Sequence, residues 1–312
     1  MFGDRLIRRL ADGSWQRVED AERCRSALSA VGLGLECNDE GCCRLPHTID
    51  LFDHDAIVSA LAPQKQVNVE VVGSVDSTNT QLLQRPAPAV GTTEVLLAEF
   101  QNAGRGRHGR TWLAPYGGGV CLSAAWQFRP QPSEPGTLSL AVGVAVIRAL
   151  AEIGVKDAKL KWPNDVHRHG QKLGGVLIDA QRQDDGLHIV AGIGLNVRLS
   201  QPTDAAIAAD GGVQPADLFR IDPSLAARRN ELAAALIEHI MQMQREFGQK
   251  GFDPFREEWN DADVLAGCTV RISGSSTLAG EAIGIDESGA LMVRAGKMTH
   301  RLLSGDVRVR AS

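Results

Sequence analysis

Near the N-terminus, apolar residues recur at steps of three or four, which is the spacing of one face of an α-helix. A first face covers residues 6–10, and a second covers residues 18–31 before a glycine that ends it. Two apolar runs, 33–37 and 42–45, then flank a polar Asn-Asp-Glu-Gly tetrad that is typical of a hairpin turn. We therefore predict two helices and a hairpin at the start of the chain.

From residue 51 to residue 266 the pattern changes repeatedly between strands and helices. Runs of β-branched or alternating apolar residues predict six strands, over 67–72, 94–100, 120–126, 158–162, 174–179 and 189–197. A continuous apolar stretch predicts a buried helix over 138–153. An amphipathic pattern predicts a long helix over 225–247, with Asp222 as its N-cap and Pro223 at its first position. A sheet covered by helices follows, so the predicted fold class is α+β.

The segment from Cys268 to Ser312 alternates short strands with glycine-containing turns at 273–274, 287–289 and 295–296. This pattern predicts a small all-β barrel of SH3-like size. The sequence thus divides into three predicted domains, which are a degenerate winged-helix-like module (1–48), a central domain (49–266) and a C-terminal β-domain (267–312).

Composition narrows the class of protein. Of the 312 residues, 43% are hydrophobic and 23% are charged, which is ordinary for a soluble globular protein. The formal net charge of −5 argues against broad attraction to nucleic acid, which needs a basic face. No apolar run of the signal-peptide type follows the N-terminus. The run at 138–153 is interrupted by Gly143, Arg148 and Glu152 and is too short to span a bilayer, so we expect a cytoplasmic protein.

The six cysteines have irregular spacings, so the sequence does not predict a disulfide framework. Cys37, Cys42 and Cys43 cluster, but no second pair with the spacing of zinc ligands follows them. We interpret these three residues as structural or surface thiols and assign them no further role.

A stretch rich in arginine and glycine carries the strongest chemical signal. It runs from Gln101 to Trp112 with the sequence QNAGRGRHGRTW and follows an apolar strand. Its glycines allow left-handed backbone geometry and bring N–H groups close to a ligand. Its arginines offer planar donor forks for phosphate or carboxylate. A loop with both features can cradle a polyanion, and the alternative is an Arg/Gly-rich solvated loop.

A second candidate group follows the strand predicted at 158–162. Asp165 closes the sequence KWPND, and Lys172 opens the apolar run KLGGVL after a polar turn. An ammonium group at the start of an apolar strand needs an anionic partner, so Lys172 is a candidate for binding a carboxylate or phosphate. Alternatively, Lys172 extends its charge to solvent at the strand end, and Asp165 is a turn or cap residue.

Two further segments add to this group. Gly192 and Gly194 alternate through the strand at 189–197, and glycine weakens a strand unless another group approaches closely. These glycines predict either a flat ligand against the backbone or a packed glycine strand. In the segment DSTN (76–79), Ser77 or Thr78 can cap a following helix and can also contact a ligand through its hydroxyl.

Taken in order, the segments DSTN, EFQNAGRGRHGRTW, KWPND, KLGGVL and GIGLN resemble those of the biotin protein ligases. The similarity covers about residues 69–197, and the predicted long helix and β-domain extend it to the C-terminus. It implies a mixed sheet with helices, like that of class II aminoacyl-tRNA synthetases and lipoate ligases, which binds biotin and ATP. The N-terminal module is similar to that of the bifunctional class, whose members also repress the biotin operon.

The resemblance implies a role for each matching residue. Biotin would be bound by Ser77, Thr78, Asn79, Gln101, Arg105, Gly106, Arg107, Lys172, Gly192 and Gly194. The nucleotide would be bound by Arg107, Arg110, Trp112 (near the adenine), Lys172 and Asn196 (near nucleotide or metal). Arg105, Arg107 and Lys172 would act on the reacting groups, and Asp165 would orient the acceptor lysine. His108 departs from the arginine that is common there in the bacterial repressors and leaves the loop one charge lighter.

The implied reaction has two steps and uses biotin, ATP and Mg²⁺. The biotin carboxylate attacks the α-phosphorus of MgATP and gives biotinyl-adenylate. A lysine of biotin carboxyl carrier protein, a subunit of acetyl-CoA carboxylase, then attacks the adenylate. The metal enters with ATP, and no dedicated protein site is expected. Because water hydrolyses the adenylate, we predict that residues 104–110 are mobile in the empty enzyme and ordered over the adenylate.

The N-terminal module matches a DNA-binding helix-turn-helix poorly. In the repressor ligases three helices precede the wing, whereas only two can be fitted before Gly32. Residues 1–47 carry seven Lys/Arg and eight Asp/Glu, a net charge of −1 that does not favour phosphate contacts. We therefore do not expect specific operator binding and interpret the module as a structural cap.

Several alternatives stay open. A lipoate or octanoyl protein ligase would share the central fold. A second alternative is a protein that acts mainly as a biotin-operon repressor, and a third gives the C-terminal β-domain the task of recognising the acceptor protein. Family members can form ligand-linked homodimers through the central sheet, but no residue here identifies that interface.

Overall fold

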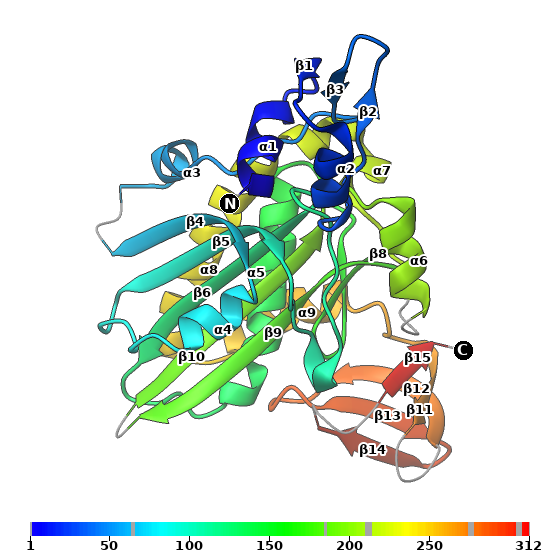
Figure 1. Ribbon diagram of the computed structural model, residues 1–312. Coiled ribbons are helices and arrows are strands. Elements are labelled where there is room, and N and C mark those ends of the chain that lie inside the picture. The colour runs from blue at the N-terminus through cyan, green and yellow to red at the C-terminus, as the bar shows by residue number, and fades with distance from the viewer. Residues whose placement is uncertain are drawn as a thin grey trace.

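The computed structural model describes residues 2–63, 66–183, 186–209, 214–273, 278–303 and 308–311. Within these residues, the central sheet has seven strands in the order β4-β5-β6-β10-β9-β8-β7 (Figure 1). β4 and β5 are parallel, and the other neighbouring pairs are antiparallel. The strands are β4 (Val67–Val75), β5 (Thr93–Gln101), β6 (Gly119–Phe128), β7 (Lys159–Lys161), β8 (Asp165–Arg168), β9 (Gln171–Gln183) and β10 (Gly186–Asn196).

The six strands predicted for the central domain are all present, and most are longer than predicted. β8 is a correction, because we predicted only a polar turn between the KWPND and KLGGVL segments. Its four residues, Asp-Val-His-Arg, include a single aliphatic side chain and therefore show no alternation. Pairing with both β7 and β9 makes this segment a strand.

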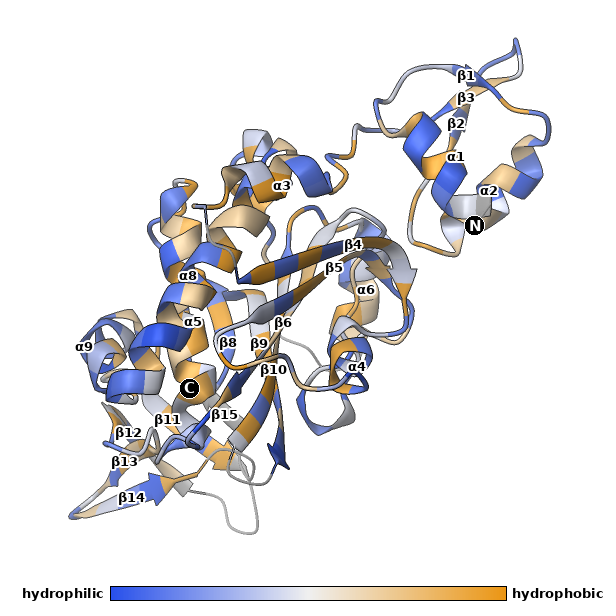
Figure 2. Cartoon of the chain, turned by 90° about the vertical axis from the view of Figure 1, so that its left-hand side faces the viewer, coloured by the Kyte–Doolittle hydropathy of each residue, from blue (hydrophilic) through white to orange (hydrophobic). Residues whose placement is uncertain are grey.

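Helices cover both faces of the sheet (Figures 1 and 2). α5 (Leu138–Glu152), α8 (Arg229–Lys250) and α9 (Asp253–Ala262) contact one another on one face, whereas α4 (Thr78–Leu83) contacts β5, β6 and β10 on the other. Side chains divide in the same way. Val95 and Leu97 of β5 belong to the large core that contains α5 and α8, while Leu96 packs with Leu82 of α4. This arrangement confirms the α+β class.

α5 confirms the predicted buried helix. The segment Pro135–Glu152 is long and apolar enough to cross a membrane by length and composition, which corrects our statement that this run is too short. In the structure, however, 61% of that segment is buried. α5 contacts α8, α9 and β9 and is therefore the central helix of the core.

The long amphipathic helix begins later than predicted. Asp222 and Pro223 begin a short 3₁₀ helix, η3 (Pro223–Ala227), and α8 begins only at Arg229. The break at Arg228 places the Arg229 guanidinium in the core, 2.8 Å from the Glu99 carboxylate. Three short helices were not predicted, namely α3 (His54–Ala60), α6 (Gln201–Ala209) and α7 (Leu218–Ile221).

The N-terminal module packs two helices against a three-stranded sheet. Its elements are α1 (Phe2–Leu10), β1 (Gln16–Arg17), α2 (Ala21–Ser29), β2 (Glu36–Cys37) and β3 (Cys42–Arg44). The predicted hairpin is confirmed as β2 and β3. The helix predicted over 18–31 is shorter, because the segment before it pairs with β3 and Asp20 caps α2 by accepting from the Arg23 N–H at 2.9 Å. Tyr116 of the central domain is buried in the core of this module.

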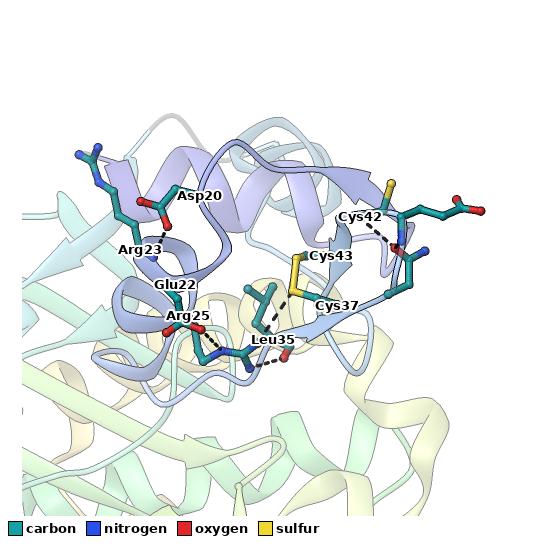
Figure 3. The surroundings of a disulfide bond; sticks show 10 residues. Asp20, Glu22, Arg23, Arg25, Leu35, Cys37, Cys42 and Cys43 are labelled. Carbon is teal, nitrogen blue, oxygen red and sulfur yellow. Dashed lines mark hydrogen bonds and ion pairs between the residues drawn. A yellow bond between two sulfur atoms is a disulfide. The ribbon is translucent and has the colours of Figure 1, made fainter.

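Cys37 and Cys43 form a disulfide between β2 and β3 (Figure 3). This corrects our interpretation of both residues as thiols, whereas Cys42 is a free thiol. The two bonded residues lie directly opposite each other in the antiparallel register. The spacing of cysteines along the sequence does not reveal this pairing, because it depends on the hairpin register.

The C-terminal segment forms an antiparallel five-stranded sheet in the order β14-β13-β12-β11-β15. The strands are β11 (Thr269–Ser273), β12 (Leu278–Ile285), β13 (Leu291–Ala295), β14 (Met298–Leu302) and β15 (Arg308–Ala311). Gly289 and Gly296 have positive φ angles of 76° and 61°, as turn glycines require. Gly274, in the first predicted turn, lies outside the described residues. An all-β C-terminal segment is thus confirmed.

Candidate active site

The predicted site residues come from segments that meet on the face of the central sheet that carries α4. The register of β10 places Gly192 opposite Ser123 of β6 and Leu177 of β9. Directly paired residues of neighbouring strands share a face. Thr78 and Asn79 open α4 above this point.

A buried chain of hydrogen bonds forms the floor of the site. The Ser123 hydroxyl lies 2.7 Å from Thr78 Oγ1 and 2.5 Å from Asn79 Oδ1. Asn79 Nδ2 donates to the Leu177 carbonyl at 3.2 Å and to Asp179 Oδ2 at 3.0 Å. Thr78, Asn79 and Ser123 are at most 3% exposed. Because both ends of the Asn79 amide are bonded, its orientation is fixed.

Gln101 and Ser77 complete the floor. Gln101 Oε1 accepts from the Thr78 backbone N–H at 2.8 Å and thereby ties the start of the Arg/Gly-rich loop to α4. The Ser77 side chain accepts from the Thr80 N–H at 3.5 Å, so Ser77 is the helix cap that the sequence predicted.

Gly192 and Gly194 allow close approach of two side chains. A Cβ atom on Gly192 would lie 2.2 Å from Asn79 Oδ1, and one on Gly194 would lie 2.5 Å from the Trp112 ring. Of the two predicted alternatives, the structure shows the packed glycine strand, because side chains of the chain itself lie against both glycines. In this structure the flat group on Gly194 is the indole of Trp112.

The Arg/Gly-rich loop folds as a tight hairpin. The Gly106 N–H donates to the Arg110 carbonyl at 2.8 Å, and the Trp112 N–H donates to the Gly104 carbonyl at 2.9 Å. His108 and Gly109 adopt positive φ angles of 56° and 74° at the tip. Among the loop glycines, only Gly109 uses the left-handed geometry that we predicted. Gly104 is required for close approach instead, since a Cβ there would lie 2.6 Å from the Trp112 carbonyl oxygen.

Two loop arginines reach opposite sides of the site. Arg105 Nη1 lies 3.5 Å from Thr80 Oγ1 and 3.8 Å from Asp179 Oδ2. Arg107 Nη1 donates to Asn164 Oδ1 at 3.3 Å. Burial lowers the pKa of Arg107. Arg110 is exposed.

Lys172 has the anionic partner that its position was predicted to need. Its Nζ lies 2.5 Å from Asp165 Oδ1 on the neighbouring strand. On the other side of the carboxylate, His167 Nε2 lies 3.9 Å from Asp165 Oδ2. Burial acts to raise the pKa of Asp165, but His167 and Lys172 outweigh burial and lower this pKa to about 2. Asp165 is therefore ionised at neutral pH.

Asn196 presents a hydrogen-bond acceptor that the chain does not use. Its Nδ2 donates to the Ala216 carbonyl at 2.9 Å. Its Oδ1 is buried and accepts no hydrogen bond from the residues that the structure describes. Buried acceptors normally have a donor, so this atom is an exception within the described residues.

A cavity of about 560 Å³ lies between the loop hairpin and β9. It is lined by residues 102–111 and 177–179 and so brings together Arg105, Gly106, Arg107 and Arg110. The floor adjoins it through the Asn79–Asp179 hydrogen bond. Lys172 and Asn196 do not line this cavity. A smaller cavity beside the N-terminal module contains none of the predicted site residues in its lining.

Sequence reasoning missed three residues of this site. Ser123 was visible as a lone hydroxyl within an apolar strand, and Asp179 as a carboxylate at the end of one. His167 gave no signal, because its proximity to Asp165 depends on the unpredicted strand β8. The assembled groups are suited to hold a neutral ring against the floor and anionic groups under the guanidinium and ammonium groups.

A family model described as the biotin/lipoate A/B protein ligase family matches residues 71–196. The chain is 31% identical to the bifunctional ligase/repressor BirA of Salmonella typhimurium, over 98% of this chain and 97% of that protein. It is 34% identical to a biotin–[acetyl-CoA-carboxylase] ligase of Mycobacterium tuberculosis, over 81% and 92% of the two chains. A structure of biotin protein ligase from Aquifex aeolicus in complex with biotin and ATP matches 78% of this chain and 99% of that chain, with a TM-score of 0.65 and 28% identity.

Proposed function

The chain belongs to the biotin/lipoate A/B protein ligase family, and we propose that it is a biotin protein ligase. It activates biotin with ATP and transfers biotin to a lysine of biotin carboxyl carrier protein. The proposal rests on the proximity of cationic groups from two segments of the chain. Arg107 of the loop bonds to Asn164, which directly precedes Asp165, the partner of Lys172.

Activation of biotin brings two anions together, the biotin carboxylate and the triphosphate. Positive groups must offset their repulsion and the charge that develops in the transition state. Arg105, Arg107 and Lys172 meet this need. Lys172 exchanges Asp165 for the biotin carboxylate and the α-phosphate, and the two arginines close over them from the loop.

The floor binds the uncharged part of biotin. Its contacts come from Ser77, Thr78, Asn79, Gln101, Gly192 and Gly194, with Gly106 closing from the loop. Because the Asn79 amide is already bonded within the chain, Asn79 acts through its position on Gly192.

The nucleotide lies on the loop side of the pocket. Trp112 offers its indole to the adenine, and Arg110 lines the cavity. Asn196 lies outside this cavity at the end of β10, and its buried Oδ1 would accept a donor of the nucleotide only after the pocket opens. In the described part of the chain, no group of three or more His, Cys, Asp or Glu side chains could hold a metal. As the resemblance implies, Mg²⁺ would enter bound to ATP, with Asn196 near the nucleotide or metal.

Transfer requires the acceptor lysine beside the adenylate. Once Lys172 moves to the phosphate, the ionised Asp165 is free to orient the incoming ammonium group. Water must be kept from the adenylate meanwhile, and closure of residues 104–110 serves that purpose.

The flanking domains have separate proposed roles. We assign residues 1–48 to a degenerate winged-helix-like module, residues 49–266 to the catalytic domain and residues 267–312 to an SH3-like β-domain that helps to recognise the acceptor protein. A cytoplasmic location and a ligand-linked homodimer belong to the same proposal. Deletion of residues 268–312 should raise the KM for the acceptor more than the KM for biotin.

The deciding experiment is transfer of labelled biotin to a biotin carboxyl carrier domain. The parent should label the carrier only when ATP and Mg²⁺ are present, and pyrophosphate exchange should depend on biotin. Lipoate in place of biotin tests the lipoate or octanoyl ligase alternative. If lipoate supports exchange and biotin does not, the proposed substrate is wrong.

A repressor role is the second candidate. It is favoured by the match of almost the whole chain, the N-terminal module included, to a relative named as a bifunctional ligase/repressor. Against it stands the net charge of −1 over residues 1–47. A gel shift with the promoter of the organism's own biotin operon, in the presence of biotin and ATP, decides between the two roles.

A further inference from the structure

His167 is a buried imidazole whose Nε2 makes no hydrogen bond with the described residues, although it lies close enough to Asp165 to lower the pKa of that carboxyl. The residue is 2% exposed, and its Nε2 lies 3.9 Å from Asp165 Oδ2, just beyond hydrogen-bond distance. Because buried polar atoms are normally bonded, such a nitrogen beside a carboxylate of the site calls for a functional explanation.

The surroundings of His167 leave Asp165 as its nearest anion. Its register partners on the flanking strands are Lys159 of β7 and Lys172 of β9. α5 packs on the opposite face of β8, where Val166 belongs to the large core, and its titratable residues are Arg148 and Glu152. Arg148 pairs with Glu246 and Glu258, and Glu152 pairs with His239, so neither is directed at His167.

An acceptor lysine must lose a proton before it can attack, because an ammonium nitrogen has no free electron pair. Building on the ligase function proposed above, we propose that His167 is the proton acceptor for this step and that Asp165 forms the bridge between the two. The carboxylate is more exposed than the imidazole, with 24% against 3% of the side chain accessible. It can therefore contact the ammonium group while the imidazole stays buried.

After Lys172 has left Asp165 for the phosphate, the ammonium gives one proton to Asp165, which passes it to His167 Nε2 once a small side-chain rotation closes the gap. The neutral amine then forms a bond to the biotinyl carbonyl carbon, and the bond from that carbon to the phosphate oxygen breaks. The electron pair leaves with AMP, and the second proton of the nitrogen goes to the AMP phosphate.

The test separates the two half-reactions in His167→Gln. Pyrophosphate exchange is measured beside transfer, and the loss should fall mainly on transfer, because the proposed proton transfer belongs to that half-reaction. Single-turnover transfer from preformed biotinyl-adenylate to the carrier domain should fall about 10²-fold at pH 7, the usual size of a general-base contribution. This deficit should shrink towards pH 9.5, where a lysine with an ordinary pKa of about 10.4 begins to deprotonate unaided. Asp165→Asn should show the same pH dependence, and the double variant should be little slower than either single variant.

His169→Asn is the matched control, because His169 is an exposed imidazole two residues away whose positive φ asparagine tolerates. It should transfer biotin at the parental rate. A His167→Gln deficit that stays constant from pH 6 to pH 9.5, or an equal loss of both half-reactions, would show a structural role and overturn the inference. Absence of pyrophosphate exchange in the parent would instead overturn the ligase function itself.

Discussion

The centre of the floor, formed by Thr78, Asn79 and Ser123, holds uncharged groups in short, buried hydrogen bonds. The arginines of the loop above it make longer contacts. Ser123 lies 2.5 Å from Asn79 Oδ1, and both residues are at most 3% exposed. Arg105 lies 3.8 Å from Asp179, and 48% of its side chain is exposed. The floor is thus rigid where a neutral ring would bind. The arginine side chains can move where anions would bind and leave.

The charged groups carry the proposed chemistry, so the largest loss of activity is expected at Lys172. Lys172→Gln should slow biotin-dependent pyrophosphate exchange by about 10²–10³-fold, as removal of a transition-state donor typically does. Lys156→Gln, at an exposed position, is the control and should match the parent. A loss below tenfold would remove Lys172 from the reacting groups.

The floor should respond through binding of biotin. In Gly192→Ala the new methyl would lie 2.2 Å from Asn79 Oδ1, so Asn79 must move and break its buried bonds. Overpacking of this kind costs about 1–3 kcal/mol, and the KM for biotin should rise by roughly tenfold or more. Gly136→Ala has nothing within 4 Å of the added methyl and should leave the KM unchanged. An unaltered KM in Gly192→Ala would show that the floor is not rigid.

Ser123→Ala tests the hydrogen bonds of the floor without adding volume. The change leaves Asn79 Oδ1 without its donor, and an unsatisfied buried polar group costs about 1–3 kcal/mol. We expect a lower free energy of unfolding in urea and a smaller rise in the KM for biotin than in Gly192→Ala. Ser29→Ala, at an exposed position of α2, provides the baseline. Equal stability of the two variants would contradict the importance of this network.

The smallest effect on stability is expected in the loop. Arg105→Gln removes an exposed pair worth about 0.2–1 kcal/mol, so the global free energy of unfolding should hardly change. Amide hydrogen exchange of residues 101–112 in the empty protein should become up to about fivefold faster, by the same energy. In the parent, biotin and MgATP should slow this exchange strongly. Equal exchange with and without ligands would contradict closure of the loop.

Local patterns predicted most elements of the fold. Strand alternation located β4, β5, β6, β9 and β10, and a continuous apolar run located α5. The boundaries of α2 and α8 were wrong, because pairing of β1 with β3 and the buried Arg229–Glu99 ion pair decide where those helices begin. Neither interaction leaves a periodic signal in the sequence.

For the candidate site, the motifs identified residues of the floor, of the Arg/Gly-rich loop and of the segment around Asp165 and Lys172. They did not identify the contacts between these segments. Asp165 was known as the close of KWPND, yet its ion pair with Lys172 depends on the β8–β9 register. Ser123 and Asp179 were overlooked because each is a single polar residue in a strand, and a strand shows nothing of its cross-strand neighbours.

The sequence by itself determined the α+β class, the all-β C-terminal segment and the residues that we propose to hold biotin and a nucleotide. Periodicity, turn residues and motifs are local properties, and the sequence records them directly. The tertiary structure decided the Cys37–Cys43 disulfide, the Trp112 contact with Gly194 and the place of His167 beside Asp165. Each of these joins residues through strand register or packing, which are set only when distant segments meet.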